Sequence, residues 1–171
     1  MKRMFLIVIL MLGVLLIGCE KTPKIEMILG VGQDTVEINT EWLDAGATLK
    51  VENKSYNAEV DGEVDTTTIG LYKIEYHYKY KGKEYKMTRY VQVVDQTKPE
   101  IQLNPGIDTI KVGEEWTDAG ATVTDNSLEE LQIIVTGEVD TNKIGTYEIV
   151  YKATDSSGNT SLVTRYVHVV E

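Results

Sequence analysis

Apolar and polar residues alternate along several segments of the chain, a pattern typical of β-strands that bury one face. The clearest segment is 72–81, where tyrosine and isoleucine occupy one phase while lysine, glutamate and histidine occupy the other. The pattern recurs at 147–153, and the segments 87–94 and 162–170 are rich in β-branched residues. Beyond residue 18 no segment has a convincing helical period, although 128–131 has room for one helical turn. The sequence therefore predicts an all-β fold.

The strand pattern belongs to an internal repeat. The matches are 44–48 with 118–122 at an offset of 74, 62–66 with 137–141 at 75, and 88–91 with 164–167 at 76. Each one-residue increase falls in a predicted loop, where a duplicated fold tolerates insertions. We therefore predict two tandem β-sandwich domains, domain 1 at 25–95 and domain 2 at 99–171, joined by a short linker at 96–98.

The first 18 residues have the parts of a bacterial signal peptide. Lys2 and Arg3 precede an apolar run that is shorter than the ~20 residues needed to span a bilayer, and a small residue stands before Cys19. The sequence Leu-Ile-Gly-Cys at 16–19 resembles the lipobox of bacterial lipoproteins. That resemblance implies cleavage after residue 18, a diacylglyceryl group on Cys19, and a lipidated tether at 19–24 outside the cell membrane. A signal anchor retained as a helix is the alternative.

Composition narrows the function classes. Cys19 is the single cysteine of the 171 residues, so the chain can form no internal disulfide. Removing residues 1–18 takes away two basic residues and no acidic ones, which moves the net charge from −10 to −12. An acidic chain of this kind argues against a nucleic-acid partner, because such proteins carry a basic footprint.

Four motifs occur in both copies: Trp-x-Asp-Ala-Gly-Ala, Gly-Glu-Val-Asp-Thr, Ile-Gly-x-Tyr-x-Ile-x-Tyr and Thr-Arg-Tyr-Val-x-Val-Val. Through them the copies resemble bacterial immunoglobulin-like domains related to hyalin repeats, which occur in tandem on surface proteins and in some pesticidal crystal toxins. The resemblance covers nearly all of 25–171. It implies two immunoglobulin-like β-sandwiches that serve as spacer, adhesive or binding modules and contain no active site.

Local chemistry accounts for the shared residues without a ligand. In each copy the Asp and Gly of Asp-Ala-Gly predict a turn with a positive φ at glycine. The tyrosine two residues after a strand-initial glycine resembles the tyrosine corner of immunoglobulin folds. The tryptophan is expected to cap the core, with stacking on a sugar ring as the alternative. These residues are Asp44, Gly46, Tyr72 and Trp42 in domain 1, and Asp118, Gly120, Tyr147 and Trp116 in domain 2.

The two copies differ most in the hairpin 78–86, which groups four lysines and three tyrosines in domain 1. In an immunoglobulin-like topology this hairpin lies at the N-terminal, membrane-facing end of the domain. We hypothesise that its lysines contact anionic head groups or wall polymers. The candidate ligand-binding residues are Tyr78, Lys79, Tyr80, Lys81, Lys83 and Tyr85. The alternative is a solvated edge hairpin whose lysines oppose aggregation and whose tyrosines form cross-strand pairs.

The same topology brings two loops of domain 2, 124–130 and 155–159, back toward the linker. Asp95, Asp125 and Asp155, together with Asn126, are oxygen donors of the kind that Ca²⁺ binds. The spacing is not that of an EF-hand, and acidic loops are usually solvated. From the sequence we therefore assign no metal ligand and no cofactor. The alternative is a calcium site at these residues that stiffens the junction.

The sequence contains few of the residues and motifs that an enzyme would need. The chain has two histidines, His77 and His168, and it contains neither a nucleophile elbow, nor a zinc-binding histidine pair, nor a phosphate-binding glycine loop. We therefore predict a non-catalytic extracytoplasmic lipoprotein that binds or adheres to a protein or glycan and contacts the membrane through the lipid on Cys19. A passive spacer or structural envelope component, and a carbohydrate-binding or wall-polymer-binding accessory protein, are the alternatives.

Overall fold

The computed structural model describes residues 22–171, and this part of the chain is all-β, as predicted. The predicted signal peptide and Cys19 lie outside the described residues. Within residues 22–171 there is no helix able to cross a membrane. The helical turn considered at 128–131 is also absent: the turn lies at Asn126 and Ser127, and Leu128 has a φ of 61°, which ends any helical path.

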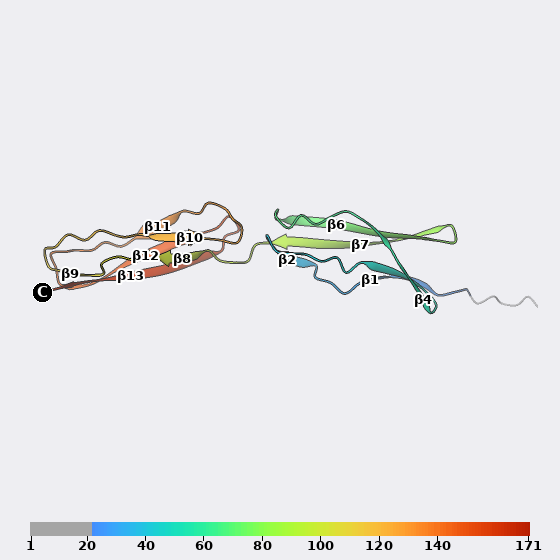
Figure 1. Ribbon diagram of the computed structural model, residues 1–171, viewed down its shortest axis with the longest axis horizontal. Coiled ribbons are helices and arrows are strands. Elements are labelled where there is room, and N and C mark those ends of the chain that lie inside the picture. Colours follow the sequence, from blue (N-terminus) through green and yellow to red (C-terminus); the bar gives the residue numbers. More distant parts are fainter. Residues whose placement is uncertain (1–21) are drawn as a thin grey trace, which may run out of the picture.

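Domain 1 is a sandwich of two sheets (Figure 1). Its strands are β1 (Ile25–Leu29), β2 (Thr35–Glu37), β3 (Ala47–Val51), β4 (Lys54–Asn57), β5 (Glu59–Asp61), β6 (Gly70–Tyr80) and β7 (Lys83–Val94). One sheet has the order β1-β3-β4 and the other β2-β7-β6-β5. All pairs are antiparallel except β2 with β7, which is parallel.

Domain 2 repeats this plan with one strand fewer. Its strands are β8 (Glu100–Leu103), β9 (Thr109–Lys111), β10 (Ala121–Thr124), β11 (Ile133–Thr136), β12 (Gly145–Thr154) and β13 (Thr160–Val170). The sheets are β8-β10 and β9-β13-β12-β11, again with one parallel pair, β9 with β13. The repeat in the sequence is therefore a repeat of topology, in which β4 has no counterpart.

The period-two pattern separates core from surface as expected. In β6 the core phase contains Ile74 at 1% exposure and Tyr76 at 0%, while the lysines of the other phase are exposed. Trp42 packs against both apolar clusters of domain 1, and its indole N–H donates to the Gln33 carbonyl at 2.8 Å. This contact favours the core-capping interpretation of the tryptophan over sugar stacking.

The predicted turns and corners are confirmed. The Asp44 carboxylate accepts a hydrogen bond from the Gly46 N–H at 2.8 Å, and Gly46 has a φ of 67°. The Tyr72 hydroxyl donates to the Thr68 carbonyl at 2.8 Å, as a tyrosine corner requires. Domain 2 repeats each contact: Gly120 N–H donates to Asp118, and the Tyr147 hydroxyl donates to the Lys143 carbonyl.

Each domain also buries one arginine between its sheets. Arg165 on β13 is 2% exposed, and its guanidinium donates to the Asp108 carboxylate at 2.7 Å and the Asn104 carbonyl at 2.6 Å. It also donates to the Gly120 carbonyl at 3.2 Å and the Tyr151 hydroxyl at 3.2 Å. Tyr151 lies on β12, whereas Asn104, Asp108 and Gly120 lie in loops next to β8, β9 and β10, so the arginine is a polar tie across the sandwich.

The two domains follow one another along the long axis (Figure 1). The tip of the β6–β7 hairpin lies at the end of domain 1 that is remote from domain 2, the same end at which β1 begins. The turn between β12 and β13 lies at the end of domain 2 nearest the linker. This is the placement that the immunoglobulin-like topology predicts for both hairpins.

Candidate functional site

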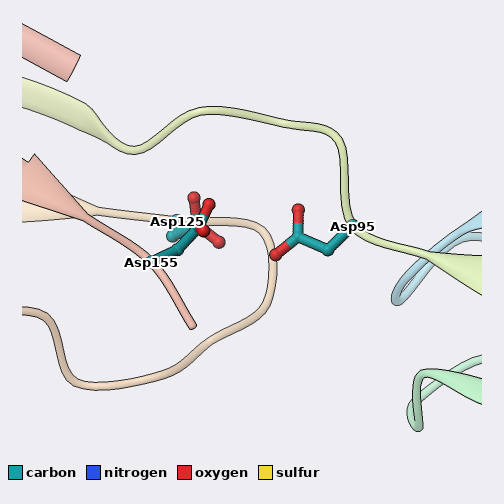
Figure 2. A group of neighbouring side chains, drawn as sticks. All are labelled: Asp95, Asp125 and Asp155. Carbon is teal, nitrogen blue, oxygen red and sulfur yellow. The ribbon is translucent and has the colours of Figure 1, made fainter. Parts of the chain in front are cut away.

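Three aspartates from separate segments meet at the junction between the domains (Figure 2). Asp95 follows β7, Asp125 follows β10, and Asp155 follows β12. One carboxylate oxygen from each lies within 4.8 Å of those of the other two. Asp95 is 8% exposed and Asp155 6% exposed, while Asp125 is half-buried. The structure thus brings together the three residues that topology alone placed near one another.

Local hydrogen bonds fix the orientation of these carboxylates. The Asp125 carboxylate accepts from the Ser127 N–H at 2.9 Å and the Ser127 hydroxyl at 2.6 Å. The Asp155 carboxylate accepts from the Asn159 N–H at 2.7 Å and the Asn159 side-chain amide at 2.9 Å. The Asp95 Oδ1 atom accepts from the Thr97 N–H at 3.2 Å. Each carboxylate is therefore held in place by a turn next to it in the chain.

Three buried oxygens at the junction receive no hydrogen bond: Oδ2 of Asp95, Oδ2 of Asp125 and Oδ1 of Asn126. Ser157 approaches Asp95 and favours its charged form, but no hydrogen bond of ordinary geometry reaches Oδ2. Burial raises the pKa of Asp95, and repulsion from Asp125 and Asp155 raises that pKa further. The cluster is thus an unfavourable concentration of negative charge.

A second polar contact crosses the junction beside the aspartates. The Glu37 carboxylate at the end of β2 accepts from the backbone N–H groups of Gln96 and Thr97 at 2.9 and 3.0 Å, and from the Asn126 amide at 3.1 Å. Burial alone would raise the pKa of Glu37, but these hydrogen bonds outweigh it and hold the pKa below its usual value. Glu37 therefore links domain 1, the linker and domain 2.

The lysine and tyrosine hairpin projects from domain 1. β5 pairs only with 75–77 of β6, and β2 pairs only with 92–94 of β7, so 78–86 has no third strand beside it within residues 22–171. Lys79, Lys81, Lys83 and Lys86 are all exposed. A row of exposed cations is therefore available at the end of domain 1 that is remote from domain 2.

The tyrosines of this hairpin are occupied in packing. Tyr56 of β4, from the opposite sheet, lies 5.4 Å from the ring centre of Tyr78 and 5.9 Å from that of Tyr80. Lys83 lies 5.0 Å from the ring centre of Tyr85, and Tyr78 faces Tyr85 across the ladder. The tyrosines thus stiffen the hairpin. Its lysines are exposed and are the groups that can reach a ligand, although Lys86 also lies 3.3 Å from the Glu84 carboxylate.

The outer face of the large sheet differs between the domains. In domain 2 it exposes Ile134 at 62%, Leu162 at 63% and Tyr166 at 51%. Ile134 and Leu162 both pair in register with Lys152, so the two side chains flank one position of the sheet. At the matching repeat positions domain 1 has Glu59 and Lys86. Two positions that are charged in domain 1 are thus apolar in domain 2, whereas both domains expose a tyrosine on this face, Tyr90 and Tyr166.

Comparison with known proteins agrees with this architecture. The family described as "Bacterial surface protein, Ig-like domain" matches residues 27–93 and again residues 105–169. The chain belongs to this family. The two matched segments fall on the two sandwiches, so each sandwich is one immunoglobulin-like domain of the bacterial surface type.

Individual proteins similar to this surface Ig-like chain add little about its action. An uncharacterized 81.3 kDa protein of Acholeplasma phage L2 is 33% identical over 113 residues, which is 60% of this chain. The match spans 15% of the length of that phage protein. The crystal structure of a lipoprotein from Bacteroides thetaiotaomicron aligns with 85% of this chain and 80% of its own, at 15% identity and a TM-score of 0.38.

Several residues of these Ig-like domains were not assigned a role from the sequence. Glu37 reaches the linker and Asn126 across 59 to 89 residues of chain, and Tyr56 meets the hairpin from another sheet. Arg89 and Arg165 were visible as a repeated Thr-Arg-Tyr-Val motif, in the same strand phase as buried valines. Their position in the alternation, on the same face of the strand as the buried valines, is the signal that would have identified the two arginines as buried.

Proposed function

We propose that this protein is a membrane-anchored, extracytoplasmic lipoprotein whose two Ig-like domains form a non-catalytic binding module. The lipid on Cys19 attaches the chain to the membrane, and domain 2, which follows domain 1 along the long axis, presents the binding face (Figure 1). Three findings support the proposal: the lipobox-like sequence at 16–19, the match to a bacterial surface family, and the apolar outer face of domain 2.

The apolar face is the observation that carries the binding role. Exposed aliphatic side chains on the outside of a sheet have no internal packing function, and such patches commonly mark sites of protein interaction. The residues are mainly aliphatic, with a charged Lys152 between them, which suits a protein partner better than a sugar. At the two corresponding positions domain 1 has Glu59 and Lys86, so the two copies of one fold differ there in surface chemistry.

Exchanging this face for its domain 1 counterpart should weaken binding. We expect Ile134→Glu with Leu162→Lys to weaken retention on an array of extracellular-matrix proteins, bacterial surface proteins and glycans by at least tenfold, since both changes place charge in an apolar contact. The control, Leu43→Lys with Leu71→Lys, alters leucines of domain 1 that are 72% and 67% exposed. A wild-type protein retained only by glycans would instead support the carbohydrate-binding alternative.

A passive spacer is the second candidate, and the junction favours it. Glu37 joins both domains and the linker by hydrogen bonds, as suits a rod that holds something away from the membrane. A spacer predicts that wild type and the exchanged variant are retained equally weakly on the array. Shortening the chain would then change the phenotype of cells, whereas altering the face would not.

The hairpin of domain 1 is proposed to lie against the membrane or wall. Each lysine near an anionic surface contributes up to about 1 kcal/mol. Replacing Lys79, Lys81, Lys83 and Lys86 with glutamine should therefore weaken the binding of unlipidated protein to phosphatidylglycerol vesicles at least tenfold in a sedimentation assay. The matched control replaces Lys98, Lys111, Lys143 and Lys152, which removes equal charge elsewhere. Equal losses in the two variants would contradict a specific role for the hairpin.

A further inference from the structure

The junction cluster lacks a positive partner, unlike the acidic residues beside the two buried arginines. Asp34 and Asp44 lie beside Arg89, and Asp108 and Asp118 lie beside Arg165. Within residues 22–171, none of the ion pairs involves Asp95, Asp125 or Asp155. Burying unpaired carboxylates is costly unless a cation compensates them. The fold therefore contains an uncompensated negative charge where its two domains meet.

The geometry of the cluster fits one divalent cation. Ca²⁺ binds oxygen at roughly 2.3–2.6 Å, so two oxygens on one ion lie at most about 5 Å apart. The three carboxylate oxygens lie within 4.8 Å of one another. In addition, Asp95 is 8% exposed, and its Oδ2 atom has no hydrogen-bond partner. The Asp95 side chain points toward Asp125 and Asp155 (Figure 2). A buried side chain that has an unpaired oxygen and points toward two further carboxylates has the geometry of a cation ligand.

We propose that Asp95, Asp125 and Asp155 bind a calcium ion that orders the junction between the two domains. The hydrogen bonds from Thr97, Ser127 and Asn159 hold the carboxylates in position before the ion arrives. Three carboxylates suit Ca²⁺ better than Mg²⁺, which gives up its water less readily and demands a stricter octahedral arrangement. Water and neutral oxygens such as the unpaired Asn126 Oδ1 complete the six to eight ligands that Ca²⁺ takes.

The ligands come from both sides of the junction, which gives the ion a mechanical role. Asp95 belongs to the segment that leaves β7 of domain 1, whereas Asp125 and Asp155 belong to loops of domain 2. A bound ion therefore fixes the exit of domain 1 against domain 2 and limits bending there. This inference does not depend on what domain 2 binds, so it stands or falls separately from the proposed function.

Calorimetric titration tests the site directly. The full chain carrying Cys19→Ala, purified in detergent and freed of metal with EDTA, should bind one Ca²⁺ with a Kd of about 1 mM or tighter, and Mg²⁺ at least tenfold more weakly. Asp95→Asn should weaken calcium binding at least tenfold. This variant is chosen because Asp95 lies outside the strands of both domains, so both sandwiches should still fold, which circular dichroism would check.

Asp140→Asn is the matched control, because Asp140 is an exposed turn residue of domain 2 that also accepts a backbone hydrogen bond, from Asn142 at 3.0 Å. It should bind calcium as the wild type does.

Spin labels on cysteines introduced at Lys73 and Lys152 should show a narrower distribution of interdomain distances with calcium than without. The proposal is overturned if the wild type takes up no calcium, if Mg²⁺ binds equally well, if Asp95→Asn and Asp140→Asn behave alike, or if calcium leaves the distances unchanged.

Discussion

Replacing Arg165 with methionine should lower the free energy of unfolding of domain 2 by about 3–5 kcal/mol, the range typical of breaking a buried charged network by removing one partner. Arg165 is 2% exposed and donates four hydrogen bonds. Methionine fills part of the volume but removes the donor of the Asn104 carbonyl and of the Asp108 carboxylate, while the Gly120 carbonyl keeps its hydrogen bond from the Asn104 N–H at 3.0 Å. Native-state hydrogen exchange would measure the change domain by domain, because the two sandwiches need not unfold together.

Arg89→Met in domain 1 provides the matched comparison. Arg89 is 3% exposed and donates to the Gly30 carbonyl, but its Nε and Nη1 atoms have no hydrogen-bond partner. The nearest acidic group to Nε is Asp34 at 3.4 Å, and that side chain is 63% exposed and readily hydrated. We therefore expect a smaller loss than for Arg165→Met. Some buried ion pairs can be replaced by apolar residues without loss. A stable Arg165→Met variant would place Arg165 in that group and refute its role as a tie.

The parts of the fold that the sequence predicted depend on interactions within a few residues. The turn at Gly46 needs an aspartate two residues earlier, and the corner at Tyr72 needs a carbonyl four residues earlier. Such contacts recur wherever the local sequence recurs, so the repeat revealed them twice. Strand phase is local in the same sense, since alternation along β6 separates Tyr76 from its exposed neighbours.

The contacts that escaped prediction join distant segments. Glu37 meets Asn126 across 89 residues, a contact that depends on how the two domains are oriented. Tyr56 meets Tyr78 because two sheets pack face to face, which alternation within one strand does not specify. The aspartate cluster is an intermediate case: topology predicts that Asp95 and Asp155 share one end, but only the structure shows that the three carboxylates converge there.

The two ends of domain 1 therefore have opposite chemistry. The end nearest domain 2 collects carboxylates, and the remote end carries the exposed lysines of the hairpin. With the acidic end bound to calcium and the basic end against anionic lipid, each charge would be compensated by a component of the cell exterior. Chelating calcium is expected to empty the site at the acidic end, whereas raising the salt concentration is expected to weaken mainly the contact between the exposed lysines and lipid.

Cys19→Ala should abolish lipid attachment completely. In a bacterial host fed an alkyne-tagged fatty acid, the wild-type chain should take up label, lose residues 1–18 and partition into the membrane fraction, because two acyl chains at about 0.8 kcal/mol per CH₂ anchor stably. The variant has no other thiol to acylate and should take up no label. Intact mass separates this outcome from a signal anchor: a wild-type chain that retains residues 1–18 and carries no lipid would establish the anchor, and a labelled Cys19→Ala variant would exclude acylation at this cysteine.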